Sequence, residues 1–181
     1  NPPPADESRD GTDHAPTIDG ESPSATEATR DLVRRFVTNV WNGENLDAIE
    51  DLATPDLVVH GLGAGVDRTR EEFVEFHAGL LDAVPDLEHA VEDVVVEGDR
   101  AVAYVTVRGT PERQYGALAP TGESFDSVAF QRYRIADGRI AELWVLPNAM
   151  GILRQLGVFP DSPAKVLRLR FGALKGRLPG R

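Results

Sequence analysis

The amino-acid sequence predicts an α+β domain in which helices cover one face of a curved antiparallel sheet. Apolar residues recur at helical spacing through the first half of the chain. The second half instead contains longer runs of strand-forming residues, separated by short turns that contain glycine and aspartate. Helices followed by a run of antiparallel strands are typical of the α+β class. A strongly bent sheet covered by helices leaves a cone open at one end, and its mouth is a natural pocket for a small molecule.

Three helices are expected in the first half. The first begins at a capping-box pattern at Ser24 and carries apolar residues at helical spacing as far as Trp41. Asn45 is the expected cap of a short second helix, and Thr69 begins a third helix with another capping box. Thr54-Pro55-Asp56 is expected to end the second helix, and a short strand over residues 57–60 separates it from the third.

Four strands and a short final helix are expected in the second half. Two tight turns, at Gly98 and Gly138, predict hairpins. Asn148 is the expected cap of a final helix that Gly157 ends. The expected strands are residues 87–96, 101–108, 124–135 and 139–146.

Charge is distributed unevenly along the chain. Residues 1–25 are acidic and rich in Pro, Gly, Ser and Thr, and we expect this tail to be disordered because it cannot bury enough apolar surface. Residues 26–160 form the predicted domain. Residues 161–181 form a basic amphipathic extension, which we expect to dock on the acidic body or on a second copy rather than on an anionic membrane.

Composition excludes several classes of function. The chain has no cysteine, so disulfides, thiolate metal sites and cysteine nucleophiles are absent. A formal net charge of −11 repels nucleic acid phosphates, so we expect no nucleic-acid partner. The histidines lack the spacing of a metal site. The sequence shows neither a signal-peptide pattern nor a membrane-spanning run, so we expect a cytoplasmic protein.

The basic residues are almost all arginines. Lys165 and Lys175 are the only lysines, and acidic residues outnumber basic ones by 30 to 19. This composition is typical of halophilic proteins, because the Debye length falls to about 3 Å in 1 M salt and an acidic surface then hardly repels itself. A GC-rich codon bias, which replaces lysine by arginine, is the alternative explanation.

Several short motifs occur in a fixed order between Leu32 and Gly157. They are Val40-Trp41-Asn42-Gly43, Pro55-Asp56-Leu57-Val58-Val59-His60, Val84-Pro85-Asp86-Leu87, Pro120-Thr121-Gly122, and Arg134-Ile135-Ala136-Asp137-Gly138-Arg139-Ile140-Ala141-Glu142-Leu143-Trp144. With this ordered set the chain resembles the SnoaL-like polyketide and ester cyclases of the nuclear-transport-factor-2-like (NTF2-like) superfamily, which also contains ketosteroid isomerase-type enzymes.

The resemblance implies a cone-shaped α+β barrel, often a homodimer formed through the sheet. It also implies ring closure by an aldol reaction without metal or cofactor, in which an aspartate takes a proton from a carbon flanked by carbonyl groups. This chain departs from the family pattern, with Asn148 at the aspartate position and Leu143 and Pro111 at two histidine positions. An amide cannot take the proton, but it can donate a hydrogen bond to an enolate oxygen.

Three residues are candidates for catalysis. His60 matches a family histidine beside a glycine-rich turn and could act as acid or base, or simply be a strand-end histidine satisfied by the backbone. Asp126 shares a strand face with the apolar Val128 and Phe130. Burial there would raise the pKa of its carboxyl and suit it to proton abstraction, whereas the alternative is a solvated strand start. Asn148 is the candidate hydrogen-bond donor to the enolate.

Four further residues are candidates for substrate contact. Trp41, Tyr104 and Trp144 could form pocket walls, since aromatic side chains suit flat ligands, although core packing is the favoured alternative for Trp41. His77 lies at the edge of the apolar stripe of the third expected helix, where a packed or surface role is favoured over ligand contact.

Two hypotheses about function follow. The first is a cofactor-independent cyclase or isomerase that acts on a small hydrophobic carbonyl compound through an enolate. The second is a non-catalytic module of the same fold that holds a ligand or mediates dimerisation. The departures at Asn148, Leu143 and Pro111 favour the second hypothesis, and His60 favours the first.

Overall fold

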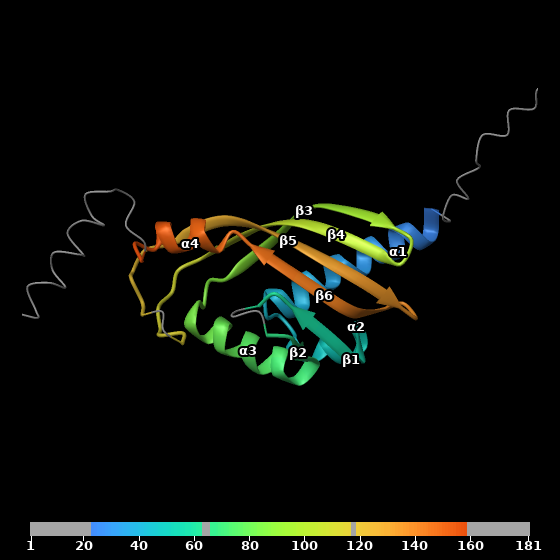
Figure 1. The fold of residues 1–181 in the computed structure, drawn as a ribbon, viewed down its shortest axis with the longest axis horizontal. Coiled ribbons are helices and arrows are strands. Elements are labelled where there is room, and N and C mark those ends of the chain that lie inside the picture. The colour runs from blue at the N-terminus through green and yellow to red at the C-terminus, as the bar shows by residue number, and fades with distance from the viewer. Residues whose placement is uncertain (1–22, 63–65, 117–118, 159–181) are drawn as a thin grey trace, which may run out of the picture.

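The computed structural model describes residues 23–62, 66–116 and 119–158 (Figure 1). Its helices are α1 (Pro23–Phe36), the π-helix η1 (Val37–Trp41), the 3-10 helix η2 (Leu46–Ala48), α2 (Ile49–Leu52), α3 (Arg70–Ala83) and α4 (Ala149–Gln155). Its strands are β1 (Ala53–His60), β2 (Arg68–Thr69), β3 (Glu88–Glu97), β4 (Arg100–Gly109), β5 (Phe125–Ala136) and β6 (Arg139–Pro147). The acidic and basic tails expected at the two ends lie almost wholly outside the described residues.

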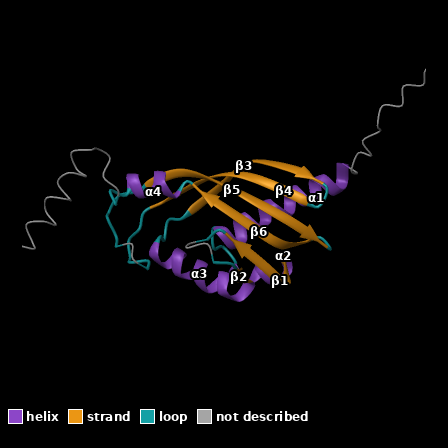
Figure 2. Ribbon diagram, in the orientation of Figure 1, coloured by secondary structure: helices purple, strands orange, loops and turns teal. Residues whose placement is uncertain are grey.

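All six strands form one curved sheet in the order β2-β1-β6-β5-β4-β3. Neighbouring strands are antiparallel except β1 and β6, which are parallel. The sheet does not close into a barrel, since β2 and β3 form its two edges. Figure 2 shows α1 crossing behind the sheet and α3 lying beside β1 and β2. The predicted α+β class is therefore confirmed.

Most of the expected elements are present, with small shifts at their ends. The capping box at Thr69 is formed, and the Asn148 side chain accepts a hydrogen bond from the Gly151 amide at the start of α4. The expected cap at Asn45 is wrong, because its side chain makes no capping hydrogen bond. Strand β1 begins at Ala53, earlier than expected, because its first residues pair with β6.

The core lies between the helices and the inner face of the sheet. Phe36, at the end of α1, packs edge-on against Tyr133 of β5 with ring centroids 6.1 Å apart. Trp41 packs in the same way against Phe73 of α3 at 5.3 Å. These four rings are almost fully buried and join both long helices to the centre of the sheet. Among the described residues, no helix is both long and apolar enough to cross a membrane.

Candidate functional site

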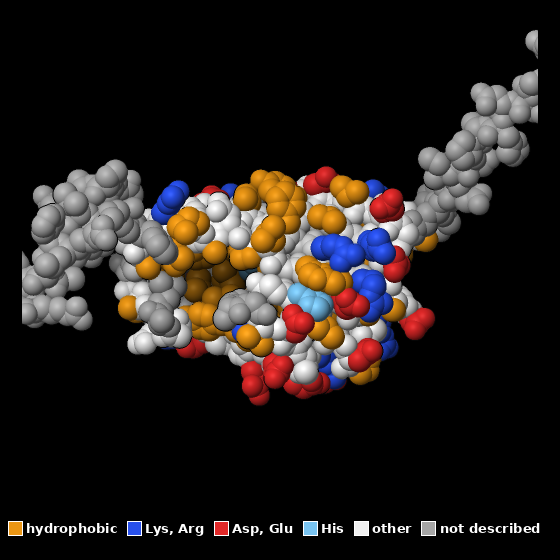
Figure 3. Space-filling view, viewed as in Figure 1, with side chains coloured by type: hydrophobic (Ala, Val, Ile, Leu, Met, Phe, Trp, Pro, Cys, Tyr) orange, Lys and Arg blue, Asp and Glu red, His pale blue; other side chains and the backbone are white. Residues whose placement is uncertain are grey.

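A cavity of about 200 Å³ lies at one end of the domain, between the inner face of the sheet, α3 and α4. Figure 3 shows the hydrophobic recess that leads into it. The lining side chains are predominantly apolar or aromatic: Trp41, Leu62, Phe76, Leu80, Val84, Leu87, Val107, Pro111, Tyr115, Phe125, Ala129, Val145, Pro147, Ile152 and Leu156. The two remaining lining residues, His89 and Gln131, are polar. Among the described residues, no Asp, Glu, Lys or Arg lines this cavity.

Trp41 forms one wall of the cavity, and its position follows from the end of the first helix. The helix widens into a π-helical turn there, in which the Asn42 amide donates to the Val37 carbonyl at 3.0 Å. His77 of α3 donates from Nε2 to the Trp41 carbonyl oxygen at 2.9 Å. The His77 ring is fully buried edge-on against the Trp41 ring, and it does not line the cavity. Its role is to hold Trp41 rather than to contact a ligand.

His89 lines the cavity from β3, and the Asn42 side chain holds its backbone in place. The amide group of Asn42 donates to the His89 carbonyl at 3.1 Å and accepts from the His89 N–H at 2.7 Å. Burial, with a smaller effect of nearby His77, lowers the pKa of His89 to about 3. The imidazole is therefore neutral near pH 7, and its buried Nδ1 has no hydrogen-bond partner.

Gln131 lines the cavity from the middle of β5. Its side chain is fully buried, and its Oε1 accepts a short hydrogen bond from the Tyr133 hydroxyl. The Nε2 group of the same amide has no hydrogen-bond partner. A buried donor without a partner is unfavourable, so this amide is suited to bind an oxygen atom of a ligand.

The structure places His60 and Trp144 on the outer face of the sheet, outside the cavity. The His60 ring stacks on Trp144 with centroids 4.7 Å apart, and its Nδ1 lies 2.8 Å from Asp67 Oδ1. The guanidinium of Arg132 covers the Trp144 ring at 4.2 Å. His60 and Trp144 are thus brought together, but neither is among the residues that line the cavity.

The other sequence-predicted residues also lie outside the cavity, except Trp41. Asp126 is exposed and accepts a hydrogen bond from Arg108 Nε at 2.9 Å, so the solvated alternative describes it. Tyr104 is exposed on the outer face and packs against Phe130. Asn148 is exposed at the N-terminus of α4. The roles proposed for these residues therefore have no cavity contact to support them.

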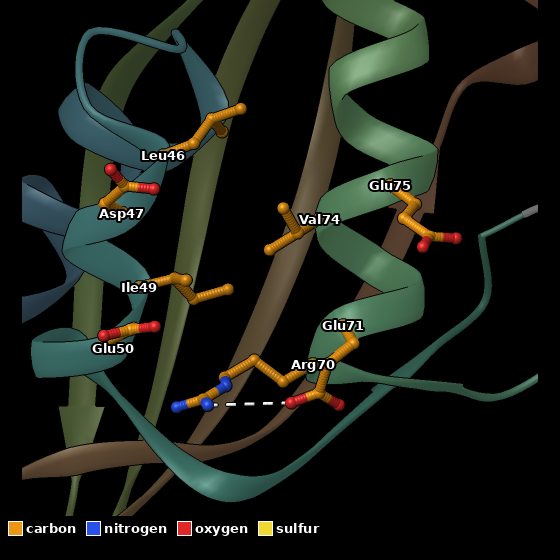
Figure 4. Close-up of a pocket in the computed structure, with 8 residues that line it drawn as sticks. All are labelled: Leu46, Asp47, Ile49, Glu50, Arg70, Glu71, Val74 and Glu75. Atoms are coloured by element: carbon orange, nitrogen blue, oxygen red, sulfur yellow. Dashed lines mark ion pairs between the residues drawn. The ribbon is translucent and has the colours of Figure 1, made fainter.

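A second hollow, of about 290 Å³, lies between α2 and α3 (Figure 4). Leu46, Ile49 and Val74 form its apolar base, and the carboxylates of Asp47, Glu50, Glu71 and Glu75 surround it. Arg70 pairs with Glu71 at 3.6 Å at one end. Most of its charged groups are already solvated, so this groove is a weaker candidate for a small hydrophobic ligand than the apolar cavity.

Comparison with known proteins identifies the family of this chain. A family model described as SnoaL-like polyketide cyclase matches residues 31–156. The chain belongs to this family. Residues of β3, β5 and α4 that line the cavity of this SnoaL-like chain all lie within the matched range. A comparison with curated proteins gives no match.

Solved structures of the NTF2-like fold resemble this SnoaL-like chain over most of its length. IdmH from Streptomyces antibioticus, named as a candidate polyketide cyclase, is 28% identical with a TM-score of 0.62 and covers 71% of this chain and 97% of its own. AclR from Streptomyces galilaeus, named as a candidate hydroxylase, is 27% identical with a TM-score of 0.65 and covers 75% and 99%. A SnoaL-like protein from Jannaschia sp. CCS1, at 23% identity and a TM-score of 0.68, supports the fold alone.

Proposed function

We propose that this SnoaL-like protein binds a small, uncharged, hydrophobic carbonyl compound in the cavity between the sheet, α3 and α4. The observation that carries the proposal is the chemical character of the lining. It is apolar except for neutral polar groups, chiefly the amide of Gln131 and the imidazole of His89. A charged ligand would lose its hydration there without gaining an opposite charge, so the cavity favours neutral molecules.

The volume of the cavity limits the size of the ligand. An apolar cavity of roughly 150 Å³ holds one benzene ring. At about 200 Å³, the enclosed space fits one ring or two small fused rings, and larger molecules must extend through the mouth. Such a ligand would contact Trp41 and Phe76 with its flat faces and direct an oxygen atom toward Gln131.

Cofactor-free cyclisation or isomerisation through an enolate is the second candidate function. Two observations favour it: family membership, and the presence among the lining residues of His89, whose buried Nδ1 has no hydrogen-bond partner. The same imidazole is a weak proton acceptor, however, because burial lowers its pKa to about 3. His60 and Asp126, the other candidate acceptors, do not line the cavity. We therefore place ligand binding ahead of catalysis.

Replacing Ala129 by leucine tests the proposed binding site. Ala129 lies on the inner face of β5 and lines the cavity, so the larger side chain should fill part of it and weaken binding of 1-indanone, a two-ring ketone, at least tenfold. Val128→Leu is the matched control, because Val128 directly precedes Ala129 on the same strand and points to the outer face. Equal binding of 1-indanone by both variants, measured by calorimetry, would contradict this site.

Deuterium uptake by a 1,3-dicarbonyl probe separates the two candidate functions. We expect no exchange above the buffer rate from the wild-type protein. Asn148→Asp should give none either, because residue 148 is exposed at the start of α4 and does not line the cavity. Exchange by the wild-type protein that is lost in His89→Gln would establish catalysis instead.

We also propose that two copies associate through the outer face of the sheet. Val95, Val102, Tyr104, Phe130 and Leu146 are all exposed on strands β3 to β6. A group of large apolar side chains on one open sheet face is typical of an interaction surface.

A further inference from the structure

We propose that Gln131 donates a hydrogen bond to an oxygen acceptor of the ligand, and that Tyr133 positions the Gln131 amide for this task. The cavity would then prefer ligands that carry an acceptor, such as a ketone, to ligands of the same shape that carry only a donor. This inference rests on the proposed function, because it names the chemical group that the same cavity recognises.

The first argument is the unequal use of the two ends of the Gln131 amide. Oε1 accepts from the Tyr133 hydroxyl, whereas Nε2 has no partner although the residue is fully buried and lines the cavity. A primary amide nitrogen donates two hydrogen bonds and accepts none. The group that Gln131 offers a ligand in this arrangement is therefore a donor.

The second argument concerns what fixes the direction of the Tyr133 hydroxyl. Tyr133 is fully buried, and burial raises the pKa of its hydroxyl. The indole N–H of Trp41 acts in the opposite direction and lowers this pKa. The amide oxygen of Gln131 can only accept a hydrogen bond, so its contact with Tyr133 directs the hydroxyl hydrogen to Oε1.

His89 is the other polar group of the cavity, and it does not impose the same preference. A neutral imidazole has one donor and one acceptor nitrogen, so His89 can pair with either kind of ligand. The selectivity that we assign to Gln131 must therefore be measured as a ratio between two ligands. Comparing this ratio between the wild-type protein and a variant cancels the contributions of His89 that both proteins share.

Three probes of nearly equal shape test the inference: 1-indanone carries only an acceptor, indole only a donor, and indane neither. For the wild-type protein we expect 1-indanone to bind about threefold to tenfold more tightly than indane, the usual range for one hydrogen bond. Indole should bind more weakly than 1-indanone. The side-chain amide resonances of Gln131 should shift in ¹H–¹⁵N spectra on addition of 1-indanone and not on addition of indane.

Two variants assign the preference to named groups. Gln131→Leu removes the donor, so its preference for 1-indanone over indane should be smaller than that of the wild-type protein. Tyr133→Phe removes the group that holds Oε1, which frees the amide to turn either end to the ligand. The ratio of 1-indanone to indole affinity should then decrease, with indole binding improved. A general loss of packing would weaken all three probes together and leave the ratio unchanged.

The possible results separate this inference from the proposed function. If no probe binds the wild-type protein, the proposed function fails. If all three bind equally, or if Gln131→Leu keeps the full wild-type preference for 1-indanone, the cavity binds ligands but Gln131 does not select them, and the inference is overturned. If neither variant folds, the wild-type affinities and the Gln131 amide resonances decide: an unshifted amide overturns the inference.

Discussion

His77 Nε2 lies 2.9 Å from the Trp41 carbonyl oxygen, and this hydrogen bond joins α3 to the π-helical end of the first helix. The π-helical turn is a local departure from regular helix geometry, and such turns are frequent at functional sites. Because the bond is fully buried, it fixes the backbone of the residue whose ring forms a wall of the cavity. A buried histidine that does not itself line the cavity thus holds one of its walls.

Replacing His77 by phenylalanine should lower the free energy of unfolding by about 1–3 kcal/mol, because the ring volume is kept but the Trp41 carbonyl loses its buried donor. Urea unfolding measures the change. His60→Phe is the control, since His60 is partly exposed on the outer face and should give a smaller loss. A variant at position 77 as stable as the wild-type protein would show that this bond does not stabilise the fold.

Stability should fall as the pH decreases below about 6.5. Burial lowers the pKa of His77 and that of His89, the latter to about 3, whereas an unfolded histidine titrates near 6.5. The unfolded chain therefore binds more protons in this range, and the stabilisation present above pH 6.5 is lost as the pH falls toward the folded pKa. For His89 alone the loss between pH 6.5 and 5 is roughly 1.5 kcal/mol.

Urea unfolding of the wild-type protein and His89→Gln at pH 6.5 and pH 5 checks this expectation. Glutamine stays neutral, so the variant should lose roughly 1.5 kcal/mol less between the two values. Both measurements are made above the range in which most carboxylates titrate. The same pH dependence in both proteins would contradict the assignment of His89 as a buried neutral group.

Phe130→Asp should convert the proposed dimer into a monomer. Phe130 is about half exposed and contacts Tyr104 in the middle of the outer face, so a charge there would be buried without a partner in a sheet-to-sheet interface. Light scattering after size-exclusion chromatography gives the mass, and circular dichroism should show an unchanged fold. A wild-type protein of 19.7 kDa at all concentrations up to about 100 μM would contradict the dimer.

The melting temperature should rise between dilute and molar potassium chloride. A formal net charge of −11 favours the unfolded chain through repulsion at low ionic strength, and salt screens that repulsion. Each kcal/mol gained should raise the melting temperature by about 2–4 °C for a chain of this size. A melting temperature that does not change with salt would favour codon bias as the source of the composition.

Local signals in the sequence predict the α+β class and most of the helices and strands. The strand ends and the caps at Thr69 and Asn148 depend on short-range chemistry, which the residues themselves display. Pro55 is typical of a helix end, so the sequence pattern places the start of β1 too late. The extended start of β1 instead depends on pairing with β6, a long-range contact that no local pattern reveals.

The site was much harder to predict, because both faces of β5 are apolar in part. Alternation correctly grouped Asp126 with Val128 and Phe130, but this is the outer face of the sheet. Ala129 and Gln131 alternate with them on the inner face. Periodicity separates two faces without telling which one the helices cover. The same ambiguity applies to His89 on β3. Its place in the cavity lining follows from the arrangement of β3 and β5 in one sheet, which no local pattern reveals.

The parallel pairing of β1 with β6 has a consequence for synthesis on the ribosome. Val59 of β1 is the register partner of Leu143 of β6. The edge of β1 that faces β6 therefore stays unpaired until β6, the last strand of the domain, has been synthesised. Until then the nascent chain exposes an unpaired apolar edge, which is a site for aggregation or chaperone binding. Ribosome-bound chains that stop before β6 should therefore be sensitive to protease, and chains that include it should resist digestion.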